Sequence, residues 1–361
     1  MKNKILSFML LATICSFVSC DSDNDLPSDP IKVVIEGATV APEVGGPNQP
    51  NQVYVDLSTS TTTKIKRDSW DLGFYSGDKF RVVINGSVYM AAAQLSSTDI
   101  DAVNSSDQEV KDLQPKVAIG TFDATSSAYI DAPSGDLNTT AIAEVSDTEA
   151  NNKVYLINLG DEIGTENPAT GSVDISDDSR GWKKVRILKD GDAYVLQYAD
   201  LDATTHSEAV ITKAKDNNFS FFSFDTEKIV SVEPAKTEWD LNFTVFTNEI
   251  EGYGAYGYSD FVINNIKSNV KVYMINTETE DFTYEAFVLA DVSTELFSND
   301  QRGIGSSWRN GGGPGSLPSL KENVFYVLED TDGNIYKIKF LAMTNDAGER
   351  GYPEFVYSLL K

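Results

Sequence analysis

A short motif that occurs twice constrains the fold of this chain more than any other feature. Ser69–Phe74 reads SWDLGF and Glu238–Phe243 reads EWDLNF. Three further pairs follow in the same order: Ile-Asn at 84–85 and 263–264, Val-Tyr-Met at 88–90 and 272–274, and Asp-Gly at 190–191 and 332–333. Matching markers in a fixed order predict two related modules in tandem, with a boundary near residue 216.

Short runs of β-branched and aromatic residues fill both halves of the chain, with Gly, Asn, Asp and Pro between them. Such runs are typical of strands, and the chain has 16 Tyr and 18 Phe against 5 Met. The clearest hairpin covers Phe325–Phe340, with Asp332-Gly333 at its turn. Residues 59–67 and 90–95 are the helical candidates. We therefore predict an all-β fold of two related antiparallel modules.

The N-terminus predicts export and a lipid anchor. Lys2 and Lys4 precede an apolar run over residues 5–17, and Cys20 follows. This pattern indicates a secretory signal peptide, too short to span a bilayer as a mature helix. Cysteine at the boundary resembles the lipobox of a bacterial lipoprotein, where Cys20 becomes the acylated first residue. The predicted segments are a signal peptide (1–19), a lipidated flexible linker rich in Asp, Pro, Asn and Gly (20–51), a first module (52–216) and a second module (217–361).

Charge and cysteine content exclude several functions. The chain carries 55 acidic against 29 basic side chains, a formal net charge of −26. Nucleic acid repels such a polyanion, so we expect no nucleic-acid partner. Cys15 lies in the predicted signal and Cys20 is expected to carry lipid, so the folded part keeps no thiol for disulfides, metals or catalysis. With His206 as the only histidine, we expect no enzyme.

The ordered series of motifs resembles the HmuY family of Bacteroidetes haem-binding surface lipoproteins, in a long, two-module form. The motifs are Lys66–Asp78 and Gly181–Arg186 in the first half, and Phe221–Phe224, Trp239–Leu241, Glu322–Val327, Asp332–Ile335 and Phe355–Tyr357 in the second. The resemblance implies an all-β fold, haem as the cofactor, and haem or a haemoprotein as the partner. It also implies a palmitate-type lipid anchor in the outer membrane, facing the cell exterior, and an outer-membrane haem transporter as a further partner.

Haem iron needs axial ligands, normally His, Met, Cys or Tyr. The resemblance implies two histidines, one just after a Trp in a Gly-rich loop. Here Trp308 is followed by Arg-Asn-Gly-Gly-Gly, and residues 277–289 contain neither His nor Met. Some relatives are thought to use Met, which makes Met90 and Met274 the tentative haem ligands, with His206 as a further candidate. Both methionines end a Val-Tyr-Met sequence, which also fits a shared packing role in the core.

Two functions from different classes follow. The first is a non-enzymatic surface lipoprotein that binds haem, or a similar flat apolar ligand, for uptake in a cleft lined by Tyr, Phe and Met. The second is a surface interaction or adhesion protein that keeps the family fold but has lost haem ligation. Its contact residues for a glycan or protein would be Tyr253, Tyr256 and Tyr258, on an insertion at 251–258.

Overall fold

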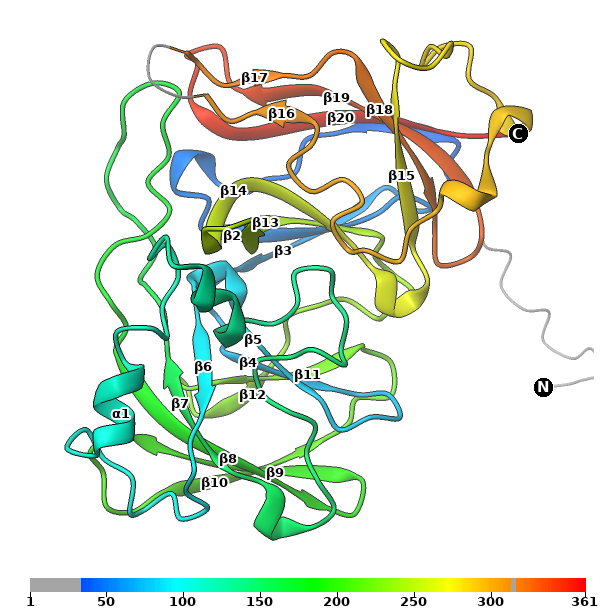
Figure 1. Ribbon diagram of the computed structural model, residues 1–361. Helices are drawn as coiled ribbons and strands as arrows, with labels where there is room; N and C mark the ends of the chain where they lie inside the picture. Colours follow the sequence, from blue (N-terminus) through cyan, green and yellow to red (C-terminus); the bar gives the residue numbers. More distant parts are fainter. Residues whose placement is uncertain (1–33, 313–315) are drawn as a thin grey trace, which may run out of the picture. The chain divides into compact units, whose positions relative to one another are not determined.

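The computed structural model describes residues 34–312 and 316–361 (Figure 1). The predicted signal peptide at 1–19 and the predicted lipid site at Cys20 lie outside the described residues. Val34–Lys361 forms one compact unit whose regular secondary structure is mainly antiparallel strands, which confirms the predicted all-β fold. No helix within the described ranges is long and apolar enough to cross a membrane.

Strands occur in both halves of the chain. They are β1 (Gly37–Val40), β2 (Asn51–Asp56), β3 (Thr61–Lys66), β4 (Leu72–Tyr75), β5 (Val82–Ile84), β6 (Ala91–Gln94), β7 (Val154–Asn158), β8 (Trp182–Asp190), β9 (Ala193–Asp200), β10 (Ser207–Thr212), β11 (Phe219–Ser223), β12 (Lys228–Val230), β13 (Leu241–Ile250), β14 (Gly254–Asn264), β15 (Lys271–Asn276), β16 (Arg309–Asn310), β17 (Ser319–Leu320), β18 (Val324–Glu329), β19 (Ile335–Thr344) and β20 (Arg350–Leu359). The helical elements are α1 (Gln108–Leu113) and the short 3-10 turns η1 (Gly46–Asn48), η2 (Gly86–Val88), η3 (Ala124–Tyr129), η4 (Glu149–Asn151), η5 (Ile266–Ser268), η6 (Leu289–Asp291) and η7 (Thr294–Leu296).

The larger sheets form two lobes, which Figure 1 shows one above the other. In the first lobe, the sheet β12-β11-β4-β5 packs on the sheet β10-β9-β8-β7-β6 through one apolar core. In the second lobe, β14-β13-β2-β3 packs on β1-β20-β19-β18-β15 through another. The two lobes have the same strand order. Strands β1, β2 and β13 of the second lobe occupy the positions that β10, β11 and β4 occupy in the first lobe.

The lobes do not coincide with the sequence repeats, because the repeats exchange their first three strands. β1, β2 and β3 come from the start of the chain but complete both sheets of the second lobe. Their counterparts β10, β11 and β12 complete the sheets of the first lobe. The chain therefore passes into the first lobe between β3 and β4 and returns between β12 and β13. The sequence boundary at 216 falls between β10 and β11, inside one lobe.

The strands that follow the two Trp-Asp pairs make this exchange specific. Leu72 on β4 pairs with Phe222 on β11, and Leu241 on β13 pairs with Val55 on β2. All four side chains are buried in the core of their lobe. Because side chains alternate across a strand, a slip of one residue would turn these groups away from the core. Core packing thus selects a partner strand from the other repeat.

Part of the predicted flexible linker is folded, so the prediction for 20–51 is wrong where the structure describes it. β1 pairs along its whole length with β20, the last strand of the chain. Val40 and Val44 are buried against the core of the second lobe. These two valines and the edge pairing outweigh the Pro and Gly content that indicated a tether.

The two helical candidates are strands. β3 occupies most of residues 59–67 and β6 most of residues 90–95. Thr61–Thr63 are β-branched and fit a strand better than a helix. Ala91–Ala93 favour helices in isolation, but they are buried and β6 pairs with β7. Here tertiary packing overrides intrinsic propensity.

The hairpin predicted at 325–340 is confirmed as β18 and β19. The side chain of Asp330 holds its turn, accepting hydrogen bonds from the backbone nitrogens of Asp332 (2.9 Å) and Asn334 (2.7 Å). Asp-Gly at 190–191, however, joins β8 to β9, whose counterparts are β19 and β20. The two Asp-Gly turns therefore occupy different places in the two lobes.

The strand exchange predicts which fragment of the chain folds. A fragment covering 69–232 contains every strand of both sheets of the first lobe, whereas one covering 52–216 lacks β11 and β12 and carries the β2–β3 pair without the rest of its sheet. We expect cooperative thermal unfolding, followed by circular dichroism, for 69–232 but not for 52–216. Equal cooperativity in the two fragments would contradict the exchange.

Candidate functional site

A cavity of about 180 Å³ lies where the inner sheets of the two lobes meet. Its lining comes from β5, β11 and the loop 130–140 of the first lobe, and from β2, β13 and β14 of the second. Trp70 and Trp239, from the two copies of the motif, both line it. These tryptophans lie on the two segments through which the chain passes between the lobes.

Each tryptophan packs against a ring from an exchanged strand. Trp239 makes an edge-to-face contact with Tyr54 of β2, at a centroid distance of 5.0 Å and an interplanar angle of 77°. Trp70 makes the same contact with Phe221 of β11, at 4.8 Å and 72°. Phe221 pairs with β4 at the same register position at which Tyr54 pairs with β13, so the two residues are structural counterparts. The aromatic walls of the cavity are therefore a product of the strand exchange.

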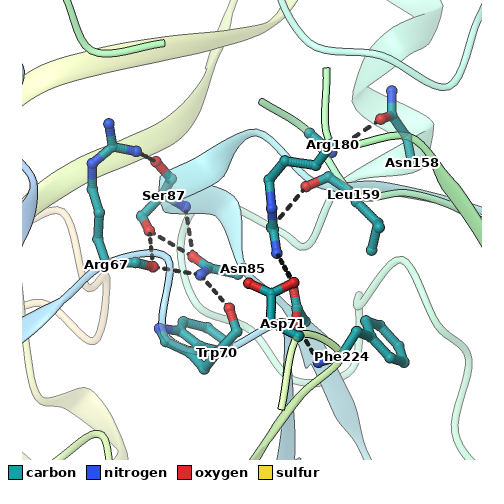
Figure 2. A network of polar contacts seen from close by, with 11 residues as sticks. Arg67, Trp70, Asp71, Asn85, Ser87, Asn158, Leu159, Arg180 and Phe224 are labelled. Carbon is teal, nitrogen blue, oxygen red and sulfur yellow. Dashed lines mark hydrogen bonds and ion pairs between the residues drawn. The ribbon is translucent and has the colours of Figure 1, made fainter. Parts of the chain in front are cut away.

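Two asparagines fix the backbone around these tryptophans. Asn85 Nδ2 donates hydrogen bonds to the carbonyl oxygens of Arg67 and Trp70, both at 2.7 Å (Figure 2). Asn265 Nδ2 plays the same role beside Trp239. It donates to the carbonyl oxygen of Trp239 at 3.0 Å and to the carbonyl oxygen at position 236 at 2.9 Å. Each asparagine also begins a 3-10 turn, so one residue shapes both the crossing segment and the next strand.

The aspartates of the two motifs differ in their electrostatics. Asp71 pairs with Arg180 Nη2 at 2.8 Å and accepts a bond from Phe224 N at 2.6 Å (Figure 2). Asp240 accepts a bond from Leu57 N at 2.8 Å, but no Lys or Arg in the described part of the chain pairs with it. Burial, with Asp330 and Asp56 nearby, raises the pKa of Asp240 to about 8.

Four side-chain atoms of cavity-lining residues are buried without a hydrogen-bond partner among the described residues. They are Gln52 Nε2, Trp70 Nε1, Trp239 Nε1 and Asn242 Oδ1. Gln52 is 2 % exposed and Asn242 is 4 % exposed. Leaving such groups unpaired costs about 1–3 kcal/mol each. Because each of these atoms is itself buried, the four lie beside the cavity without opening onto it.

The lining contains more carboxyl groups than basic side chains. Burial raises the pKa of Glu233 to about 8 and that of Asp131 to about 6. Asp131 also accepts bonds from the backbone nitrogens of Ile84 (2.8 Å) and Ala141 (2.9 Å). Lys267 is the basic residue of the lining, and it donates to the carbonyl oxygen at position 135. Burial lowers the pKa of Lys267 to about 8.

The structure does not bring the predicted haem ligands together. Met90 is fully buried and lines the cavity. Met274 is 41 % exposed on β15, at the edge of a sheet in the second lobe. His206 precedes β10 in the first lobe, where Nδ1 lies 2.9 Å from Asp101 and Nε2 3.6 Å from Glu208. Cys20 lies outside the described residues.

The predicted equivalence of Met90 and Met274 is wrong. Met90 N donates to Asn85 O at 3.3 Å, and Val270 N donates to Asn265 O at 3.1 Å. Because these asparagines begin equivalent turns, Val270 is the counterpart of Met90, and Met274 lies further along β15. The second Val-Tyr-Met is a chance match, since the capped turn sets the register.

The tyrosines of the alternative function lie on a long hairpin. Residues from Gly254 onward belong to β14, so the predicted loop at 251–258 is a loop only around its first residues. Tyr253 is 57 % exposed and Tyr256 is 38 % exposed. Phe122 of the first lobe is 62 % exposed and contacts Tyr256 at a centroid distance of 5.7 Å.

Sequence patterns point to Met90 and to both tryptophans but not to the polar lining. Gln52 and Glu233 belong to no recognised motif, and Asn242 stands in the second copy of the repeated motif where the first copy has Gly73. One feature of the sequence could have indicated two of these residues. Gln52 and Asn242 are amides within strands that are otherwise rich in apolar and β-branched residues. In the described residues, no group of three or more His, Cys, Asp or Glu side chains could hold a metal ion.

Two segments of the chain, residues 48–209 and 215–357, match the HmuY protein family. The chain therefore belongs to the HmuY family, and the match occurs twice in tandem, as the repeat predicts. No curated protein sequence matches the chain.

Three solved structures are similar to the chain. One is an HmuY-like heme-binding protein from Bacteroides vulgatus (10 % identity, 92 % of this chain and 94 % of that one, TM-score 0.23). Another is the apo HmuY analog of Tannerella forsythia (12 %, 91 % and 98 %, TM-score 0.23). The third is apo PinO from Porphyromonas gingivitis (16 %, 48 % and 94 %, TM-score 0.22). Membership in the HmuY family rests on the two matched segments.

Because Asp71 pairs with an arginine and Asp240 does not, replacing each aspartate with asparagine should have opposite effects on stability. Asp71→Asn removes the buried carboxylate that pairs with Arg180, leaves it only exposed Asp225 at 3.7 Å, and should lower the free energy of unfolding by about 3 kcal/mol. Asp240 has a folded-state pKa of about 8, well above the usual pKa of an aspartate, so stability is lost as pH rises from the usual value to the folded-state one. Asp240→Asn should remove that loss and stabilise the protein at pH 8.

Urea unfolding at pH 5 and pH 8 measures both effects, and each variant serves as the control for the other. Equal destabilisation of the two variants at both pH values would show that the aspartates play the same role.

Proposed function

We propose that this protein is a non-enzymatic binding protein whose ligand lies in the interlobe cavity. The observation that carries the proposal is that Trp70 and Trp239, from the two copies of the motif, line one aromatic cavity. Ligand sites are typically concave and mostly apolar, with a few polar groups that orient the ligand. Membership in the HmuY family supports binding rather than catalysis.

In this proposal Cys20 carries the lipid that anchors the protein in the outer membrane, with the folded part outside the cell. The basic start, the apolar run and the cysteine at its end support this location. Stable anchoring needs two or more acyl chains, as in bacterial lipoproteins.

The residues of the cavity do not fit haem. Pockets for drug-sized ligands measure roughly 300–1,000 Å³, whereas this cavity measures about 180 Å³. Met90 is its one candidate ligand from the sequence, while Met274 and His206 lie in other sheets or at their edges. Carboxylates of a haem would find one basic residue in the lining, Lys267, which already donates to the carbonyl oxygen at position 135. We therefore propose a flat ligand smaller than haem.

Indole is a suitable probe of the proposed site because it is flat and uncharged. At about ten times its Kd, we expect indole to raise the melting temperature by about 2 °C. Thr244→Phe, on the cavity face of β13, should fill the space and abolish the shift. Thr62→Phe, on the exposed strand β3, is the matched control and should keep it.

Titration of the same protein with haemin, followed by absorbance, tests whether haem is the ligand instead. We expect no Soret shift under oxidising or reducing conditions. A Soret shift that disappears in Met90→Ala or Met274→Ala would make haem the ligand and overturn the proposal of a smaller one.

The exposed aromatic group of Phe122, Tyr253 and Tyr256 favours surface adhesion as a second candidate function. Exposed apolar patches mark interaction sites on soluble proteins. We expect the double variant Phe122→Ser, Tyr256→Ser to reduce retention of the protein on mucin-coated plates at least fivefold. Leu341→Ser, which changes another exposed apolar residue, should not reduce it. Unchanged retention of the double variant would remove this function.

A further inference from the structure

We propose that residues 132–139, which we call the strap, form a releasable wall of the interlobe cavity and set the largest ligand that the cavity accepts. This inference rests on the proposed function and deepens it, because it concerns the size limit of the same site. Most residues of the strap line the cavity, namely Ala132, Pro133, Gly135, Asp136 and Leu137.

The base of the strap is fixed to the first lobe. Asp131 Oδ2 accepts a hydrogen bond from Ile84 N at 2.8 Å, and Asp131 Oδ1 accepts one from Ala141 N at 2.9 Å. One carboxyl group therefore joins the two ends of the strap to each other and to β5. Just outside this clamp, Ile130 is 6 % exposed and Ile142 is 1 % exposed. The two ends of the strap are thus anchored in the first lobe.

The far side of the strap is fastened to the second lobe by hydrogen bonds from two residues. Gln301 N donates to the carbonyl oxygen of Ser134, and Gln301 Nε2 donates to that of Pro133, both at 3.0 Å. Lys267 Nζ donates to the carbonyl oxygen of Gly135. Three consecutive carbonyl oxygens of a first-lobe segment therefore hold it against the second lobe.

No buried side chain of the strap reinforces these hydrogen bonds. None of residues 132–139 is buried, and Leu137 belongs to none of the apolar cores of the described chain. Segments with few buried apolar contacts open at a lower free energy than the core does. The strap should therefore release from the second lobe while both lobes stay folded.

Release of the strap would remove one wall of the cavity and leave its aromatic walls in place. Trp70 and Trp239 lie on other segments, each packed against a ring of its own lobe. With the strap fastened, the cavity measures about 180 Å³, and an engineered cavity of about 150 Å³ holds benzene. The fastened strap thus limits the ligand to one or two rings, whereas a released strap admits a larger flat ligand beside the same tryptophans.

Gly135 makes the fastened position possible. Its φ is +84°, and a Cβ at this position would lie 2.8 Å from the side chain of Gln301 and 2.9 Å from that of Ile266. Because the same Gln301 side chain donates to the strap, Gly135→Ala must displace a fastening group. Gly333 has a φ of +85°, but a Cβ there meets no described atom beyond its chain neighbours within 4 Å. Gly333→Ala is therefore the matched control, with similar backbone strain far from the strap.

Hydrogen exchange of the ligand-free protein, measured at single-residue resolution, tests the release. The amide of Gln301 reports the fastened side, and the amides of Ile84 and Ala141 report the base. We expect Gly135→Ala to lower the protection factor of the Gln301 amide at least tenfold and to leave the base amides protected. Gly333→Ala should change none of the three. Equal loss of protection at all three amides in Gly135→Ala would mean that the strap does not move separately, and would overturn the inference.

Indole and pyrene, with two and four fused rings, then test the size limit by calorimetry and fluorescence. We expect Gly135→Ala and Gln301→Ala to bind pyrene at least tenfold more tightly than the wild-type protein, and Gly333→Ala to match the wild type. Adding Thr244→Phe to Gly135→Ala should abolish the gain, which places the pyrene in the cavity.

The outcomes separate this inference from the proposed function. If pyrene binding does not increase in the two strap variants while indole binding is lost in Thr244→Phe, the size limit is wrong and the cavity remains the site. If indole binding does not depend on Thr244, the proposed function fails and the inference fails with it.

Discussion

The pairing of each Trp-Asp-Leu strand with a strand of the other repeat is the constraint on which the rest of the structure depends. β4 pairs with β11 and β13 pairs with β2, and both pairs bury leucine against an apolar partner. Because the pairs cross between repeats, the chain must pass twice from lobe to lobe. Those passages carry Trp70 and Trp239 to the cavity. The fold, the aromatic walls and the candidate site thus have one physical origin.

Much of the fold follows from local patterns in the sequence. Runs of β-branched and aromatic residues indicate strands, and the Asp330 turn defines a hairpin without reference to the rest of the chain. The choice of partner strand cannot be predicted in this way. β2 and β11 have similar apolar patterns, so either could pair with β4 on local grounds. Only packing of the complete lobes selects between them.

At the candidate site, too, local sequence patterns predict some features and fail to predict others. Repetition of Trp70 and Trp239 indicates a paired feature, and the structure places both at one cavity. The Val-Tyr-Met repeat is misleading, because Asn85 and Asn265, not the tripeptide, set the register of the following strand. Gln52 and Asn242 gain their importance only from being buried without partners, which depends on residues distant in the chain. Such environments are properties of the assembled protein.

The pairing of β1 with β20 has a mechanical consequence. The first described strand of the chain lies at the edge of a sheet and is hydrogen-bonded to the last. A pull on the N-terminal side therefore loads a strand fastened to the C-terminal end, and neither end can peel away without breaking the same ladder. An exopeptidase that reaches β1 or β20 meets the same ladder of hydrogen bonds.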